Sequence, residues 1–181
     1  MASEGPFTPA TFSDSDAVGT VAWSNPTNAG ASDNSRAIAD SGIGTATFLT
    51  VKIVKGGVVS GDNLAAGNAI ETAEAYVSFG GEGNTGGVAL TGADVKAADF
   101  GCVVQTTTLG GDSHYLKGLD VPFATIADAT VVTGVLIEVE ASRTVGANGD
   151  ARVDHVRMTV YYADSGKPTH TMNFTRMRNN Q

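Results

Sequence analysis

Cysteine and aromatic residues are scarce in this chain, and their scarcity limits how it can be held together. Cys102 is the only cysteine among 181 residues, so no disulfide can form within the chain. It lies in the apolar run FGCVV (residues 100–104), which predicts a small buried side chain rather than a reactive thiol. Aromatic residues make up only 7%. The core must therefore be built mainly from Val, Ile, Leu and Ala.

Long apolar runs and basic residues are also few. No run approaches the roughly 20 apolar residues of a membrane-spanning helix. The first residues, MASEGPFTPATF, lack the basic and apolar regions of a classical signal peptide. Nineteen acidic residues outnumber eleven basic ones, and the formal net charge is −8. We therefore expect synthesis in the cytoplasm, no membrane partner, and no nucleic-acid partner, because an acidic surface repels phosphate.

Glycine and alternating polar and apolar residues, by contrast, are plentiful. The clearest alternation spans residues 131–162, where Val135, Ile137 and Val139 are separated by polar or larger side chains. After a turn rich in Gly and Asn, the alternation resumes at Val156. Period-two alternation on both sides of a polar turn predicts an antiparallel hairpin with one buried face.

A second alternating stretch lies in residues 45–55. Leu49, Val51 and Ile53 alternate with Thr50 and Lys52, which predicts a strand. The pair Gly56-Gly57 follows and predicts a tight turn into a returning strand.

The rest of the chain predicts more strands and very little helix. Thr91 is placed to cap one helical turn, with Asp94 near its N-terminal end. Counting the alternating stretches gives eight or nine strands, separated by turns. This pattern predicts an all-β fold, an antiparallel β-sandwich of jelly-roll-like type, over residues 21–163.

The two ends of the chain differ from this body. Residues 1–20 contain two prolines, and small polar residues separate Phe7 from Phe12. We predict an extended N-terminal docking arm, with a disordered tail as the alternative. Trp23 follows it and is predicted to close one end of the core beside the docking surface.

The C-terminal residues 164–181 are predicted to form a final strand or arm that adds to a neighbouring subunit's sheet. Met172 and Phe174 alternate there with polar residues, and two arginines make the segment locally basic. An acidic body and a basic tail attract one another between subunits. The predicted interface residues are Phe7, Phe12, Trp23, Met172, Phe174 and Arg176.

No catalytic constellation is evident, and we predict that the protein is not an enzyme. None of the three histidines (His114, His155 and His170) has metal-ligand spacing with another His, Cys or Glu. Glu138 and Glu140 share one face of a strand roughly 7 Å apart, and paired carboxylates can serve glycoside hydrolysis. We interpret them as solvated residues of an outer face.

Four oxygen-rich loop pairs are of the kind that calcium bridges in β-sandwiches. Asp and Asn are also good turn formers, so we predict no metal and no cofactor, with calcium as the alternative. The pairs are Asp14 with Asp16, Asp33 with Asn34, Asp62 with Asn63, and Asn148 with Asp150.

Several segments together resemble a known group of proteins. They are AWSNPTNA (22–29), VKIVKGGVVSGDNLA (51–65), AYVSFGG (75–81), LTGADVKAADFGCVV (90–104), ATVVTGVLIEVEASR (129–143) and ARVDHVRMTVYY (151–162). These segments resemble virion-associated β-sandwich proteins of tailed bacteriophages and cover most of residues 21–162. The motifs belong to strands and turns, and no catalytic residue comes with them.

The resemblance implies an accessory structural subunit of the virion, on the capsid surface or on a tail or collar appendage. Its expected partners are other virion proteins, such as the major capsid or tail proteins, and further copies of itself. The alternative is a carbohydrate-binding module of a phage fibre that contacts host surface glycans. That module would need exposed aromatic side chains, for which the candidates are Trp23, Tyr76, Tyr115 and Tyr161.

Overall fold

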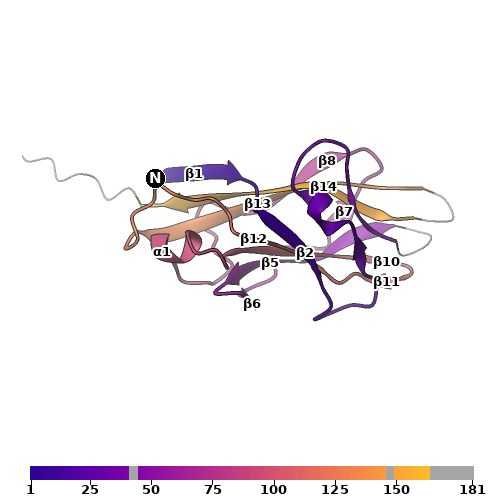
Figure 1. Cartoon of the computed structure of the whole chain (residues 1–181), viewed down its shortest axis with the longest axis horizontal. Coiled ribbons are helices and arrows are strands. Elements are labelled where there is room, and N and C mark those ends of the chain that lie inside the picture. Colours follow the sequence, from indigo (N-terminus) through magenta and orange to yellow (C-terminus); the bar gives the residue numbers. More distant parts are fainter. Residues whose placement is uncertain (41–44, 146–148, 164–181) are drawn as a thin grey trace, which may run out of the picture.

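Two antiparallel sheets packed face to face form the body of the molecule (Figure 1). The structure is a computed structural model that describes residues 1–40, 45–145 and 149–163. Nearly all regular structure in these ranges is β, which confirms the predicted antiparallel β-sandwich. The described residues form fourteen strands, more than the predicted eight or nine, because several strands are only two or three residues long.

The first sheet has the strand order β3-β4-β14-β13-β8, with β1 also paired to β14 and β9 to β13. Its long members are β13 and β14, which form the predicted hairpin and run along most of the molecule's length (Figure 1). The strands are β1 (Ala2–Phe7), β3 (Trp23–Ser24), β4 (Ala37–Ala39), β8 (Ala75–Gly81), β9 (Leu90–Thr91), β13 (Val131–Arg143) and β14 (Ala151–Tyr162).

The second sheet has the order β2-β12-β10-β5-β6, with β11 also paired to β10 and β7 to β5. The strands are β2 (Thr11–Ser15), β5 (Ala46–Lys55), β6 (Val58–Ser60), β7 (Ala69–Ile70), β10 (Gly101–Thr108), β11 (Gly111–Asp112) and β12 (Tyr115–Leu119). The predicted turn at Gly56-Gly57 joins β5 to β6, and both glycines have positive φ.

Among the described residues, helical structure is confined to two short elements, η1 (Pro26–Ala29) and α1 (Gly92–Val95). The predicted helical turn is confirmed with its cap. The Thr91 hydroxyl accepts from the backbone N–H of Asp94, and the Asp94 carboxylate accepts from the backbone N–H of Thr91. This reciprocal capping box satisfies two N–H groups at the start of the turn.

The core lies between the sheets, and the hairpin supplies much of it. Val135, Ile137, Val139, Val156 and Met158 are fully buried. The residues between them point to the outer face, as the alternation predicted. Burial of these aliphatic side chains between two sheets is the main source of stability for a sandwich of this kind.

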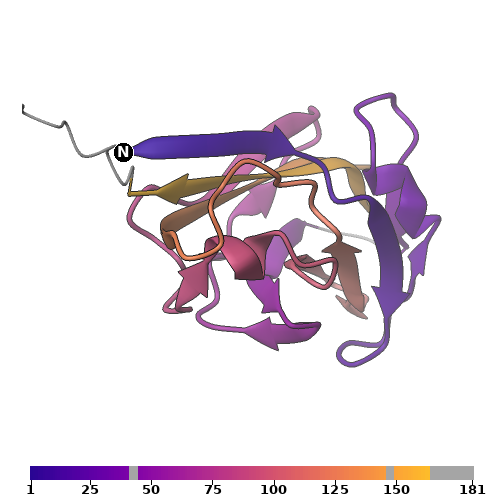
Figure 2. The same ribbon diagram turned by 60° about the vertical axis from the view of Figure 1, so that its left-hand side comes forward.

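Residues 1–20 differ from the predicted docking arm. They place β1 along the edge of β14, with Ala2 opposite Tyr162, and then cross to place β2 along the edge of β12 (Figure 2). Phe12 is 8% exposed and packs over Gly118, where an added Cβ would lie 2.8 Å from the Phe12 ring. The segment therefore closes one side of its own sandwich, because its apolar side chains find burial there.

The strand predicted in residues 45–55 is β5, and a bulge interrupts its alternation. The pairing of β5 with β10 shifts between Thr50 and Phe48, so Leu49 is an extra residue in a β-bulge. Leu49 is 36% exposed, whereas Phe48 is fully buried. The strand prediction is confirmed, and the bulge reverses the alternation of buried and exposed side chains at Leu49.

Candidate functional site

Polar side chains gather on the outer face of the first sheet. Tyr76 on β8, Glu140 on β13 and His155 on β14 are direct cross-strand partners, and Glu138 and Arg157 pair in the next row. Directly opposed side chains lie roughly 5 Å apart, so these groups can contact one another. We call the cluster the outer-face network; it comprises Thr8, Asn34, Arg36, Glu74, Tyr76, Glu138, Glu140, Asp154, His155 and Arg157.

His155 joins three elements of the network. Its Nδ1 lies 2.7 Å from the hydroxyl of Tyr76, and its Nε2 lies 2.6 Å from Oγ1 of Thr8, in the segment that links β1 to β2. Burial lowers the pKa of His155 below its usual value, against the opposing effect of Glu140. The ring is therefore neutral at pH 7, and both of its nitrogens are already engaged within the chain.

Arg157 engages Glu138 and covers Tyr76. Its Nε and Nη2 donate to the two carboxylate oxygens of Glu138, at 2.9 and 3.1 Å. The hydrogen bond with Glu138 raises the pKa of Arg157. The guanidinium carbon also lies 4.1 Å from the centre of the Tyr76 ring, a cation–π contact. Glu138 is thus held as the partner of a cation, and one face of Tyr76 is covered.

A second β-bulge brings Asp154 into the network. The register between β13 and β14 shifts after the pair Glu140 and His155, which leaves Asp154 as the extra residue. Its side chain is turned out of the regular alternation and is 2% exposed. One carboxylate oxygen, Oδ2, accepts the backbone N–H of Asn34 at 3.3 Å.

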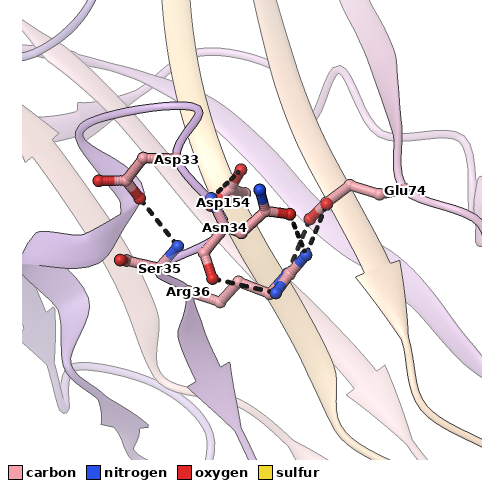
Figure 3. Close-up of polar contacts among 6 residues, drawn as sticks. All are labelled: Asp33, Asn34, Ser35, Arg36, Glu74 and Asp154. Carbon is pink, nitrogen blue, oxygen red and sulfur yellow. Dashed lines mark hydrogen bonds and ion pairs between the residues drawn. The ribbon is translucent and has the colours of Figure 1, made fainter.

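The loop before β4 is tied down through the same residues (Figure 3). Asn34 has a positive φ of 66°, and its backbone and side-chain oxygens accept from Nη1 and Nη2 of Arg36 at 3.1 and 3.0 Å. Nε and Nη2 of Arg36 also donate to the two oxygens of Glu74, at 2.8 and 2.6 Å. Asn34 and Arg36 therefore connect β14 to the segment that leads into β8.

Two carboxylate oxygens of the network are buried without a hydrogen-bond donor, Oε2 of Glu140 and Oδ1 of Asp154. Burial raises the pKa of Asp154; the N–H of Asn34 opposes this effect, and the negative charge of Glu74 adds to it. A carboxylate in this situation binds a proton more readily than an exposed one. Within residues 1–40, 45–145 and 149–163, no group of three or more His, Cys, Asp and Glu could hold a metal ion.

The chemistry of the network favours a structural role over catalysis. A glycosidase needs one free carboxyl group as acid and another as base or nucleophile. Glu138 is bound by Arg157 through both oxygens, and the ring nitrogens of His155 are both occupied. The network therefore ties β8, β13, β14, the loop before β4 and the β1–β2 link to one another.

Of the six predicted interface residues, the structure describes Phe7, Phe12 and Trp23, and it does not bring these three together on the surface. Phe12 and Trp23 are buried in the core, and Nε1 of Trp23 donates to the backbone oxygen of His114 at 2.8 Å. Phe7 is half-buried and packs edge-on against Phe123, with ring centres 5.5 Å apart. In this fold Phe12 and Trp23 are not available as anchors on a neighbour. Met172, Phe174 and Arg176 lie outside the described residues.

The oxygen-rich loop pairs are largely engaged within the chain. Asp14 accepts the backbone N–H of Trp23 at 2.9 Å and contacts Nδ1 of His114 at 2.9 Å. The side chain of Asn63 hydrogen-bonds the backbone of β5 at the bulged residue Leu49 and at Val51. Asn148, of the fourth pair, lies outside the described residues.

Cys102 is 1% exposed in the core, as its apolar surroundings predicted. Burial raises the pKa of its thiol to about 12. The thiolate is the reactive form of cysteine, so Cys102 is unreactive at neutral pH.

Sequence reasoning missed half of the network. Thr8, Arg36 and Glu74 lie outside the alternating stretches, and no local pattern connects them with β14. The place of Tyr76 in the network depends on the register between β8 and β13, which the sequence alone does not give. The burial of Asp154 could not be predicted, because it results from a bulge. A bulge changes which side chains are buried, but it leaves no mark in the alternation of polar and apolar residues.

Comparisons with protein-family models, with curated proteins and with solved structures found no match. In the described ranges, none of the helical segments has the length and apolar character needed to cross a membrane.

Proposed function

We propose that this protein is an accessory structural subunit of a tailed-bacteriophage virion, on the capsid surface or on a tail or collar appendage. It acts by binding other virion proteins and copies of itself through surface shape, with no chemical step. The resemblance supports this role, since its segments coincide with the central hairpin β13–β14 and the elements packed around it. A jelly-roll connectivity belongs to the same proposal.

The observation that carries the proposal is the internal pairing of the outer-face network. Its cations and its histidine bond to groups of the same chain and hold strands and loops together. A rigid body of this kind suits a subunit that must keep its shape through assembly. Contacts with neighbours are assigned to the outer surface and to Met172, Phe174 and Arg176 in the C-terminal residues.

Two of the four aromatic residues that the carbohydrate-binding alternative requires are not free to stack on a sugar. Trp23 is 3% exposed, and Arg157 covers one face of Tyr76. A sugar-binding groove needs aromatic faces open to solvent. No feature of the described residues favours that alternative over the structural role.

The test is to image the particles with which the protein copurifies, with and without the chain. We expect density at regular positions on the capsid, collar or tail that disappears when the chain is absent. Glu138→Gln and His155→Gln variants should still be incorporated, because neither residue performs chemistry in this proposal. Absence of the protein from particles would contradict the proposal. So would cleavage of glycan or peptide that Glu138→Gln abolishes.

A further inference from the structure

An apolar groove is lined by residues of β9, α1 and the start of β13. Figure 1 shows these elements at the end of the sandwich that carries the N-terminus. The groove encloses about 630 Å³. Val131 is 61% exposed along it, Val88 and Ala89 form part of its wall, and Leu90 and Val132 are buried beneath. Lys55 and Asp94, which pair with each other at 3.1 Å, lie on its polar rim.

Three exposed apolar side chains lie at this end of the described structure. They are Met1 (71% exposed), Val58 (65%) and Val131 (61%), three of the six large apolar residues that are exposed among all the described residues. Sδ of Met1 is 3.4 Å from Oγ1 of Thr133, a groove residue, and Val58 pairs with the groove residue Lys55. Clustered exposed apolar groups mark surfaces that bind something.

The C-terminal residues start beside this groove. Tyr162 at the end of β14 is the register partner of Val132 in the groove, and the described part of the chain ends one residue later, at Ala163. The remaining eighteen residues, 164–181, can span up to roughly 60 Å. They are therefore long enough to reach any part of the groove from their starting point.

The composition of these residues matches the groove in polarity and complements the rest of the chain in charge. Met172, Phe174 and Met177 supply apolar side chains, separated by polar residues. Residues 1–163 contain 18 acidic and 8 basic residues, a net charge of −10, whereas residues 164–181 contain one acidic and three basic residues, a net charge of +2. Opposite net charges favour association of the two parts.

We propose that the groove binds residues 170–178 of the same chain, with Phe174 against Val131. The proposal concerns the free subunit and goes beyond the virion role, which it neither requires nor establishes.

A disulfide-trapping experiment on the full chain tests the proposal. Ala89→Cys and Asn173→Cys are introduced together, and Cys102 stays silent because it is buried. The control pairs Asn173→Cys with Ala22→Cys, an exposed position beside β3, towards the opposite end of β14. We expect the groove pair to close a disulfide within one chain at least about tenfold faster than the control pair, as measured by peptide mapping.

Two further variants sharpen the test. Val131→Asp should slow trapping by about tenfold, since it removes roughly the apolar burial of one valine from the contact. Val145→Asp, which changes an equally exposed valine at the far end of the hairpin, should leave the rate unchanged. Equal rates for the groove and control pairs, or a disulfide that forms only between two chains, would overturn the proposal. Either result leaves the particle-imaging test of the virion role unaffected.

Discussion

Glu4 and Asp154 are two buried carboxylates in contrasting surroundings. Glu4 is 8% exposed, and Oε1 accepts the backbone N–H groups of Ala124 and Thr125 at 2.8 and 3.1 Å. Burial alone would raise the pKa of Glu4, but the N–H groups of Ala124 and Thr125 outweigh it, and the pKa is lowered. Asp154 is 2% exposed, has one such donor, and has a raised pKa.

The difference shows that the charged form of Glu4 is stabilised by the fold, whereas the charged form of Asp154 is destabilised by it. The charged form of Glu4 fastens β1 to the loop between β12 and β13, so the first residues of the chain belong to the body. The charged form of Asp154 lies among Glu74 and Glu140 and is only partly compensated by Arg36. The bulge places the Asp154 carboxylate where it accepts the backbone N–H of Asn34, in the loop before β4. The same position removes this charge from water, which destabilises its charged form.

The largest effect is expected from the apolar anchor of the N-terminal segment. Phe12→Ala should lower the free energy of unfolding by about 3–5 kcal/mol, because a buried aromatic ring is lost from the core. Thr11→Ala, at the exposed neighbouring position, should change it by less than about 0.5 kcal/mol. Urea unfolding of the monomeric protein measures both. A docking arm that only meets neighbours would give no difference between the two variants.

The next largest effect is expected from Glu4→Gln. This variant should lower the free energy of unfolding by about 1–3 kcal/mol at neutral pH, because it replaces hydrogen bonds to a charged acceptor with weaker ones. Since the folded-state pKa of Glu4 lies below its unfolded value, its contribution is present above the unfolded pKa. It is lost as the pH falls through the folded pKa. The free energies of unfolding of Glu4→Gln and of the parent protein should therefore approach each other as the pH is lowered through the acid range. Glu82→Gln, an exposed control, should show no such trend.

Arg36→Met tests how much the positive charge of Arg36 stabilises the charged form of Asp154. Removing the guanidinium leaves Glu74 and Asp154 without it, and we expect a loss of about 1–2 kcal/mol, moderated by the partial exposure of the pair. In the double variant Arg36→Met/Glu74→Met, part of that loss should return. A double variant that is less stable than the single one would mean that Glu74 contributes nothing adverse to this site.

Asp154→Asn should have the opposite sign to Glu4→Gln. The folded-state pKa of Asp154 is raised, so its contribution is present below the unfolded pKa and is lost as pH rises through the folded pKa. The amide keeps the acceptor for Asn34 and removes the charge. We expect the variant to gain stability over the parent as pH rises towards neutral, with Asp33→Asn as an exposed control. A loss of stability at pH 7 would mean that the charge of Asp154 is compensated.

The sequence was sufficient wherever local pattern decides the structure. The alternation of Val135, Ile137 and Val139 predicted the central hairpin, and Thr91 with Asp94 predicted the one helical turn. The apolar run around Cys102 predicted its burial. In each case the physical cause acts between residues close in sequence or on one strand face, so it can be seen without knowing the fold.

Long-range register decided what the sequence could not predict. Leu49 and Asp154 are extra residues opposite a partner strand, and a bulge is defined only by that pairing. Phe12 and Glu4 were assigned to an arm because their partners, Gly118 and the backbone at 124 and 125, lie more than a hundred residues away. The interface roles of Met172, Phe174 and Arg176 stay predictions.

Amide hydrogen exchange in the full-length chain tests most directly whether the N-terminal segment belongs to the body. Amides in β1 and β2 that pair with β14 and β12 should exchange slowly, with protection approaching that of their partner strands. Exchange of residues 2–7 and 11–15 at the rate of an unfolded peptide, while β13 and β14 remain protected, would contradict the structure and restore the docking arm.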